Sequence, residues 1–129
     1  MSKRDELMAM AIKVEAADPA QQPALLSAAW DLLARPGWID ADRSARFVRY
    51  IEAEAFESAA IMLVPDGALS TLDIAERRCW LRGESGLGLA LRTTHGKGST
   101  VAYALTAACL RTRINQYDAG DSVSASSAS

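Results

Sequence analysis

The sequence feature that most constrains the fold is an apolar stretch near the C-terminal end, VAYALTAACLRTRI at residues 101–114. Within residues 101–110 only Thr106 is polar. A helix that is apolar nearly all round must be covered on more than one side, so this stretch predicts a central helix. Either Ser99 or Thr100 is placed to cap its first turn through a side-chain oxygen.

Helical periodicity recurs in three stretches before residue 65. Apolar residues share one face at residues 5–17 and again at residues 23–34, where Pro23 suits the first turn. The Ala- and Glu-rich stretch at residues 44–64 is also helical in period, and its pattern fits one helix or two. Pro65-Asp66-Gly67 then predicts a turn.

The period changes to that of strands after residue 67. Leu72 and Ile74 alternate with other residues, residues 79–82 form a second short run, and residues 87–92 alternate leucine with glycine, alanine and arginine. Three short strands predict an antiparallel meander with the central helix packed on one face. The expected fold is therefore α+β, a layered sandwich of N-terminal helices, a three-stranded sheet and a central C-terminal helix.

The length of 129 residues predicts a single domain, which we place at residues 1–117. The small polar residues 118–129 predict a disordered tail. The N-terminal residues carry acids and no apolar core of a secretion signal, and no run reaches the roughly 18 apolar residues of a membrane span, so we expect a cytoplasmic protein. Cys79 and Cys109 are expected to be reduced and buried.

Two segments resemble a known family. FESAAIMLVPDG at residues 56–67 and the helix at residues 101–114, which ends in Leu-Arg-Thr-Arg, are similar to small phage and prophage proteins related to the Phage ABA sandwich group. Val101 and Thr106 stand where such closing helices often carry proline and cysteine. The resemblance implies an α, β-sheet, α layered fold and a phage-derived accessory role, and it supplies no catalytic residues.

Charge is nearly balanced overall but uneven along the chain. The formal net charge of −2 gives no strong signal for nucleic acid or membrane. Residues 67–129, however, hold 7 basic and 5 acidic side chains, and the loop-like RTTHGKGST at residues 92–100 combines glycines with cations before a helix start. This pattern is compatible with an anion site, with these candidate ligand-binding residues: Arg82, Arg92, His95, Lys97, Ser99 and Thr100. Leu91 occupies the position of the first glycine of a Walker A motif, so the stretch does not match that motif. A mobile strand-to-helix turn is the simpler interpretation of residues 92–100.

Catalytic and metal-binding arrangements are not expected. His95 is the only histidine, so it is interpreted as an exposed loop residue, and two cysteines and one histidine fall short of a zinc site. The glutamates of residues 52–57 are interpreted as a solvated helix face. Trp80 lies among arginines that could stack bases and hold phosphates, although a core position is the favoured interpretation.

The sequence therefore predicts a non-catalytic phage or prophage accessory protein that acts as a binding or interaction module, without cofactor or metal. Two alternatives stay open. The protein could be an anti-defence factor that sequesters an anionic nucleotide immune signal, with the basic residues near His95 as ligands. It could instead be a phage assembly factor that self-associates, because a small sheet with an exposed edge can pair with a second copy.

Overall fold

The computed structural model of the protein describes residues 2–34, 41–64, 68–83 and 93–128. Within these ranges it contains five α-helices, one short 3₁₀ helix and three strands. In chain order these are α1 (Lys3–Glu15), the 3₁₀ helix η1 (Pro19–Gln21), α2 (Gln22–Ala34), α3 (Ala41–Glu52), α4 (Phe56–Ile61), β1 (Ala68–Asp73), β2 (Arg78–Gly83), β3 (Thr93–Lys97) and α5 (Val101–Ala128). In the described part of the chain, no helix has the length and apolar character needed to cross a membrane.

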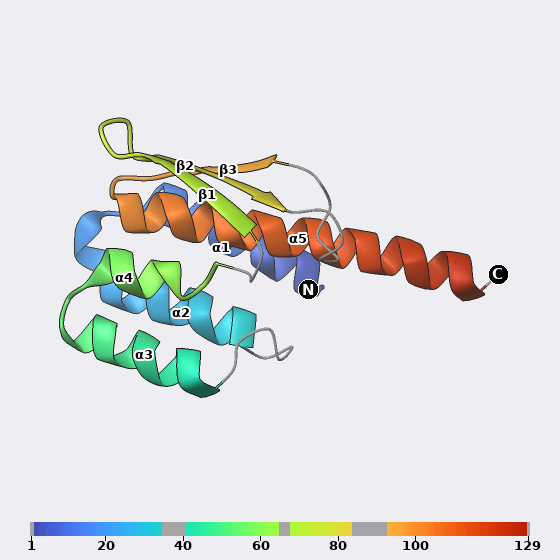
Figure 1. The fold of residues 1–129 in the computed structure, drawn as a ribbon, viewed down its shortest axis with the longest axis horizontal. Coiled ribbons are helices and arrows are strands. Elements are labelled where there is room, and N and C mark those ends of the chain that lie inside the picture. The colour runs from blue at the N-terminus through green and yellow to red at the C-terminus, as the bar shows by residue number, and fades with distance from the viewer. Residues whose placement is uncertain (1, 35–40, 65–67, 84–92, 129) are drawn as a thin grey trace.

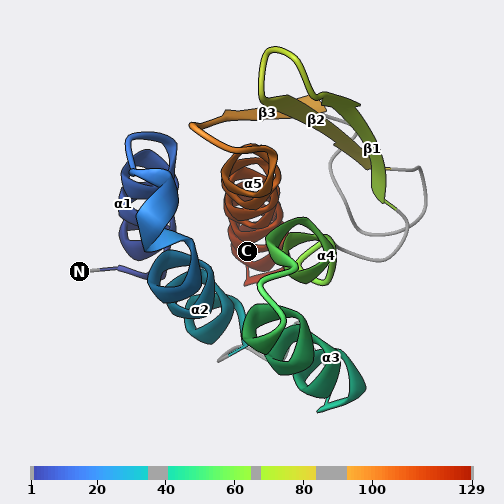
Figure 2. The same ribbon diagram turned by 90° about the vertical axis from the view of Figure 1, so that its left-hand side faces the viewer.

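The elements form layers, as the α+β prediction required. Figure 2 shows the three strands above α5, with α1 and α4 on either side of that helix and α2 and α3 below. The described helices therefore cover α5 and leave the outward face of the sheet without a helix (Figures 1 and 2). One hydrophobic core joins the layers, with α5 at its centre.

The central position of α5 is confirmed. Every residue from Val101 to Leu110 is buried, and Tyr103 is the largest fully buried side chain. Thr100 provides the N-cap, because the backbone N–H of Tyr103 donates to Thr100 Oγ1 at 3.1 Å. The polar Thr106 is tolerated inside this core because its hydroxyl donates to the carbonyl of Ala102 at 2.7 Å.

The sheet has the predicted antiparallel order β1-β2-β3, but its third strand lies later in the chain than expected. The segment of residues 87–92, where the third strand was predicted, lies outside the described residues, as does the turn at residues 65–67. The observed β3 instead spans Thr93–Lys97, within the stretch interpreted as a mobile turn. That interpretation was wrong because the strand is formed by pairing with β2, with Trp80 opposite His95, and by packing on α5.

The stretch at residues 44–64 forms two helices. Glu54 has a φ of 58°, and this left-handed residue ends α3. The N–H of Ala55 donates to the carbonyl of Tyr50 at 2.8 Å, and the N–H of Glu54 donates to the carbonyl of Ile51 at 3.0 Å. These two hydrogen bonds form a Schellman motif, which satisfies the last carbonyls of α3 and turns the chain into α4.

The C-terminal helix differs from the expected tail. The structure continues α5 to Ala128, through residues for which the sequence predicted disorder. Figure 1 shows this end of α5 projecting beyond the other elements. Adding a residue to an existing helix costs far less than starting a new one, and this continuity is the physical reason that a helix can extend past its packed region.

We predict that Gly96→Ala strongly destabilises the protein. A Cβ atom at Gly96 would lie 2.1 Å from the carbonyl oxygen of Ala104 and 2.5 Å from the nitrogen of Ala108. These are backbone atoms of α5, so relief requires β3 to move away from the helix. We expect a loss of at least about 3 kcal/mol in the free energy of unfolding, measured by urea denaturation.

An alanine substitution at exposed Ser70 on β1 is the control, and we expect it to change stability by less than about 1 kcal/mol. Equal stability of Gly96→Ala and the natural protein would contradict the close approach of β3 to α5.

Candidate functional site

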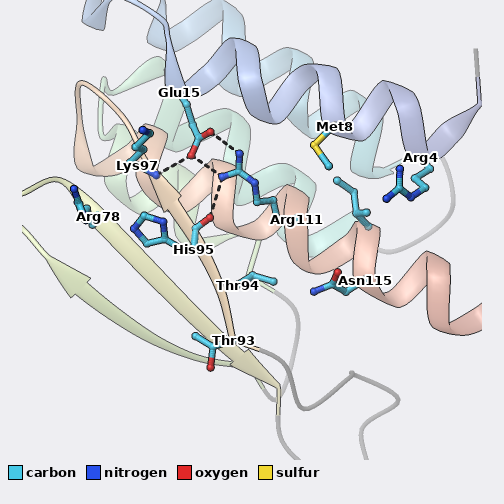
Figure 3. A pocket seen from close by; sticks show the side chains of 11 residues that line it. Arg4, Met8, Glu15, Arg78, Thr93, Thr94, His95, Lys97, Arg111 and Asn115 are labelled. Atoms are coloured by element: carbon cyan, nitrogen blue, oxygen red, sulfur yellow. Dashed lines mark hydrogen bonds and ion pairs between the residues drawn. The ribbon is translucent and has the colours of Figure 1, made fainter.

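The candidate site is a groove of about 690 Å³ along the β3 edge of the sheet. Figure 3 shows that α1 forms one wall, α5 the floor, and β3 with the neighbouring end of β2 the other wall. Its lining is mostly polar, with four cationic side chains and two apolar ones. The lining residues are Arg4, Met8, Glu15, Arg78, Thr93, Thr94, His95, Lys97, Arg111, Ile114 and Asn115.

An ion pair between Glu15 and Arg111 crosses the groove and closes the edge of β3. Arg111 Nη2 lies 2.5 Å from Glu15 Oε1, and Arg111 Nη1 lies 2.6 Å from Glu15 Oε2. The same Arg111 Nη1 donates to the carbonyl of His95 at 2.9 Å, while Glu15 Oε2 accepts from the backbone N–H of Lys97 at 3.1 Å. The pair thus satisfies one acceptor and one donor of β3 that a fourth strand would otherwise satisfy (Figure 3).

Burial and charge have opposite effects on Glu15. Burial raises the pKa of its carboxyl, whereas the Arg111 hydrogen bond, the Lys97 N–H and the charges of both residues lower it, and the net pKa lies below its ordinary value of 4.5. The hydrogen bond to Glu15 raises the pKa of Arg111. Glu15 is therefore ionised and held by the arginine at neutral pH.

The groove carries a net positive charge. Four of its lining side chains are cationic and one is a carboxylate, which gives a net charge of +3 with His95 neutral. Arg78 and Lys97 are directly opposed across β2 and β3. Like charges in such a cross-strand pair repel each other, and an anion bound beside them would remove that cost.

His95 lies in β3 beside the groove, so its interpretation as an exposed loop residue was wrong. The side chain is half-buried, and its ring is tilted at 43° against that of Trp80, with ring centroids 5.1 Å apart. Its Nε2 atom is buried and has no hydrogen-bond partner in the described part of the structure. Trp80 is also half-buried between the buried Cys79 and Leu81, which face α5, so the favoured prediction that Trp80 belongs to the core was wrong.

The structure brings together only some of the predicted site residues. His95 and Lys97 line the groove, and Arg82 is exposed on β2 outside it, while Arg92 lies outside the described residues. Ser99 and Thr100 do not line the groove, because their side chains hold the α1–α2 connection. Ser99 Oγ donates to the carbonyl of Ala17 at 2.7 Å, and Thr100 Oγ1 donates to Gln22 Oε1 at 3.0 Å.

Gly96 also has a different role from the one expected. The sequence pattern suggested a glycine that lets the backbone approach a ligand, but Gly96 is buried and its missing side chain lets β3 approach α5. Thr94, on the same buried face, bonds the strand to the helix through Thr112, with 2.6 Å between the two hydroxyl oxygens. The inner face of β3 thus packs on α5, its edge is bonded by Glu15 and Arg111, and its outer face is available to a ligand.

The contribution of α1 to the groove was not predicted from the sequence. Arg4 and Glu15 come from that helix, and Glu15 meets an arginine 96 residues away in the chain. In sequence these two residues resemble ordinary charged residues at the ends of an amphipathic helix. No local pattern indicates that they share a groove with β3.

The remaining reactive side chains are unsuited to chemistry in this groove. Cys79 and Cys109 are both buried and free, as predicted. Burial raises the pKa of Cys79 to about 11 and also raises that of Cys109, which disfavours the reactive thiolate. Among the described residues, no three His, Cys, Asp or Glu side chains gather where they could hold a metal ion. Glu52, Glu54 and Glu57 are exposed, as predicted, but they do not share a helix face, because Glu54 lies between α3 and α4.

Fold and site together define an α+β protein with a basic groove at a closed sheet edge. Searches against family models, curated proteins and solved structures found no match to this chain. The function must therefore be argued from the groove itself.

We predict that Glu15→Gln destabilises the protein in a pH-dependent way. The folded-state pKa of Glu15 lies below 4.5, so ionised Glu15 stabilises the fold above that pH, and this stabilisation is lost as the pH falls through the folded-state pKa. At pH 7 we expect Glu15→Gln to cost about 2 kcal/mol, the order of a hydrogen bond to a charged group. Urea denaturation from pH 7 to pH 3 should show the difference from the natural protein shrinking below about pH 4.5.

The matched control is Glu57→Gln, because Glu57 is an exposed glutamate on α4. It should change stability by no more than about 0.5 kcal/mol at any of these pH values. A Glu15→Gln penalty that does not depend on pH would show that the carboxylate charge is not what stabilises the β3 edge.

Proposed function

We propose that this protein is a non-catalytic binding module whose groove between α1, β3 and α5 holds a phosphate-bearing anion. The observation that carries the proposal is the net charge of +3 on the groove lining, whose one carboxylate is already bound by Arg111. An anion entering the groove would therefore meet a lining with more positive than negative charge.

The chemistry of the lining favours phosphate over a simple carboxylate. Arg4 and Arg78 present planar guanidinium groups and Lys97 an ammonium group, and phosphate accepts hydrogen bonds from both kinds of donor through several oxygens. His95 adds a buried Nε2 atom without a partner close to Arg78 and Lys97 (Figure 3). A polar atom of this kind gains a partner when a ligand carrying hydroxyl or phosphate oxygens arrives.

A binding role is favoured over catalysis because the one carboxylate among the described lining residues is not available as a base. Both oxygens of Glu15 already accept hydrogen bonds from Arg111, and one also accepts from Lys97. A general base must reach the proton that it removes, and this carboxylate is held away from that task. The two thiols are buried and protonated, so neither supplies a nucleophile.

Anion binding can be tested by titrating the protein with inorganic pyrophosphate and measuring heat by calorimetry. We expect binding that weakens as salt is raised, because the contacts are between charges. The double variant Arg78→Gln, Lys97→Gln removes two cations and should weaken binding about tenfold or more, which is about 1.4 kcal/mol.

Arg49→Gln is the matched control, since Arg49 is an exposed arginine on α3, on the side of the molecule away from the sheet (Figure 2). It should bind pyrophosphate like the natural protein. Absence of any binding to the natural protein, or equal loss in both variants, would contradict a phosphate site in this groove.

The biological setting follows from the resemblance to small phage and prophage proteins. On that basis we propose a phage or prophage accessory protein acting in the cytoplasm. A binding module of this kind would suit sequestration of an anionic nucleotide signal of the host, with His95 and Lys97 among its ligand-binding residues.

Self-association is a second candidate function, and one specific observation favours it. Beside the open edge of the sheet, Leu72 of β1 is 39% exposed and Ile74, in the following turn, is 72% exposed. An edge strand with exposed apolar neighbours can pair with the same strand of a second copy. This would suit a phage assembly factor.

If β1 mediates self-association, the molecular mass measured by light scattering should rise with protein concentration. Ile74→Lys should then reduce self-association by introducing like charges across the interface. Ile12→Lys, at an exposed apolar residue of α1, is the control and should leave the mass unchanged. A strict monomer at all concentrations would exclude this candidate.

A further inference from the structure

From the outward face of the sheet we infer that the ligand is a single-stranded oligonucleotide, with a base stacked on Trp80 and phosphates held by the cations on either side. This inference rests on the proposed anion groove and names the ligand class for it. It is carried by the arrangement of one aromatic pair with Arg78 and Lys97 on one side and Arg82 on the other side of the same face.

Side chains on a strand alternate between the two faces of a sheet, so burial identifies the faces. Cys79 and Leu81 of β2 and Thr94 and Gly96 of β3 are buried toward α5. The residues that alternate with these four along the strands therefore point outward. On β2 and β3 these are Arg78, Trp80, Arg82, Thr93, His95 and Lys97.

The centre of this outward face is aromatic. Trp80 is paired with His95 in the strand register, and the two rings are in tilted contact with centroids 5.1 Å apart. On the other side of Trp80 the register places Thr71, an exposed residue with a short side chain. Because every nucleobase has a flat π-face, an accessible indole on an open sheet can stack a base without requiring one sequence.

Cations lie on both sides of the aromatic pair. Arg78 and Lys97 form the pair on one side, and Arg82, opposite Thr93, lies on the other. Asp73, opposite Arg78, is the single acid at the corresponding positions of β1. Three cations and one acid leave this face net positive, although the whole chain carries −2.

The spacing of these cations favours a strand over a single nucleotide. Arg78 and Arg82 are four residues apart on β2, which separates their Cα atoms by about 13 Å at about 3.3 Å per residue. Two phosphates of one strand can occupy both sides while a base lies on Trp80 between them. One phosphate shared by both arginines would have to sit over the indole, where it would displace the base.

The outward face is also continuous with the groove. Arg78, Thr93, His95 and Lys97 line the groove and belong to the outward face as well. A strand crossing the sheet from Arg82 past Trp80 would therefore reach the basic groove along α1 with its next phosphate. This continuity accounts for cations extending from β2 to Arg4 (Figure 3).

The test compares three probes with the full-length protein: a fluorescent ten-nucleotide oligothymidylate, thymidine monophosphate and inorganic pyrophosphate. Binding of the oligonucleotide is followed by fluorescence anisotropy and that of the two small probes by calorimetry. Under one salt condition we expect the oligonucleotide to bind at least about tenfold more tightly than the mononucleotide. Its affinity should fall with salt at a logarithmic slope of about −2, from about three phosphate contacts on single-stranded nucleic acid.

Variants distinguish base stacking on Trp80 from anion binding in the groove. Trp80→Leu should weaken oligonucleotide binding about tenfold, the usual effect of losing one stacked base, and leave pyrophosphate binding unchanged. Trp80→Phe keeps an aromatic ring and should retain most of the affinity. Arg82→Gln should reduce the salt slope by about 0.7, whereas the control Arg49→Gln should not alter it. Circular dichroism and thermal unfolding show whether each variant is folded.

An NMR spectrum of the indole N–H groups provides an independent readout if Trp80→Leu fails to fold. The Trp80 signal is the one that Trp80→Phe removes, and the oligonucleotide should shift it. The inference is overturned if the mononucleotide binds as tightly as the oligonucleotide or if the Trp80 signal does not move. If pyrophosphate and the oligonucleotide bind equally tightly, base stacking on Trp80 is overturned and the proposed anion groove is retained. Failure of all three probes to bind would overturn both.

Discussion

The architecture depends on the direct contact between the backbone of β3 and the backbone of α5. Gly96 has no Cβ, and only this absence lets the strand lie against the carbonyl of Ala104 and the N–H of Ala108. The hydroxyls of Thr94 and Thr112 join the same two elements inside the core. Because β2 pairs with β3 and β1 with β2, this contact sets the position of the sheet together with Cys79 and Leu81 of β2, which are buried in the core with α5.

The same contact places the β3 edge beside α1 and so creates the candidate site. Glu15 and Arg111 bond each other and the two backbone groups of β3 that face them. One ion pair therefore joins the first helix, the last strand and the central helix, and it leaves Lys97 and its neighbours as the cations that face solvent. This half-buried charge pair fixes the observed position of β3 through one backbone donor and one backbone acceptor.

The sequence was informative where the signal was local and silent where the structure depends on distant contacts. The central helix was predictable because residues 101–110 are apolar on every face. The periodicity was compatible with one helix or two at α3 and α4, and the left-handed backbone of Glu54 divides the stretch into two. Residues 93–97 contain glycine, histidine and lysine and carry no strand pattern, so β3 exists through its partners. The groove could not be foreseen, since Glu15 and Arg111 are 96 residues apart and only the fold makes them neighbours.

The ion pair at β3 has a further consequence for how copies of the protein can associate. A sheet with two open edges can add strands at both and grow without limit, as fibres do. Here the β3 edge is occupied by Glu15 and Arg111, and only β1 offers an unpaired edge in the described sheet. Two copies joined through β1 would leave no further edge to extend, so pairing would end in a closed two-fold dimer. The residues that shape the groove would thereby also protect the protein from polymerisation.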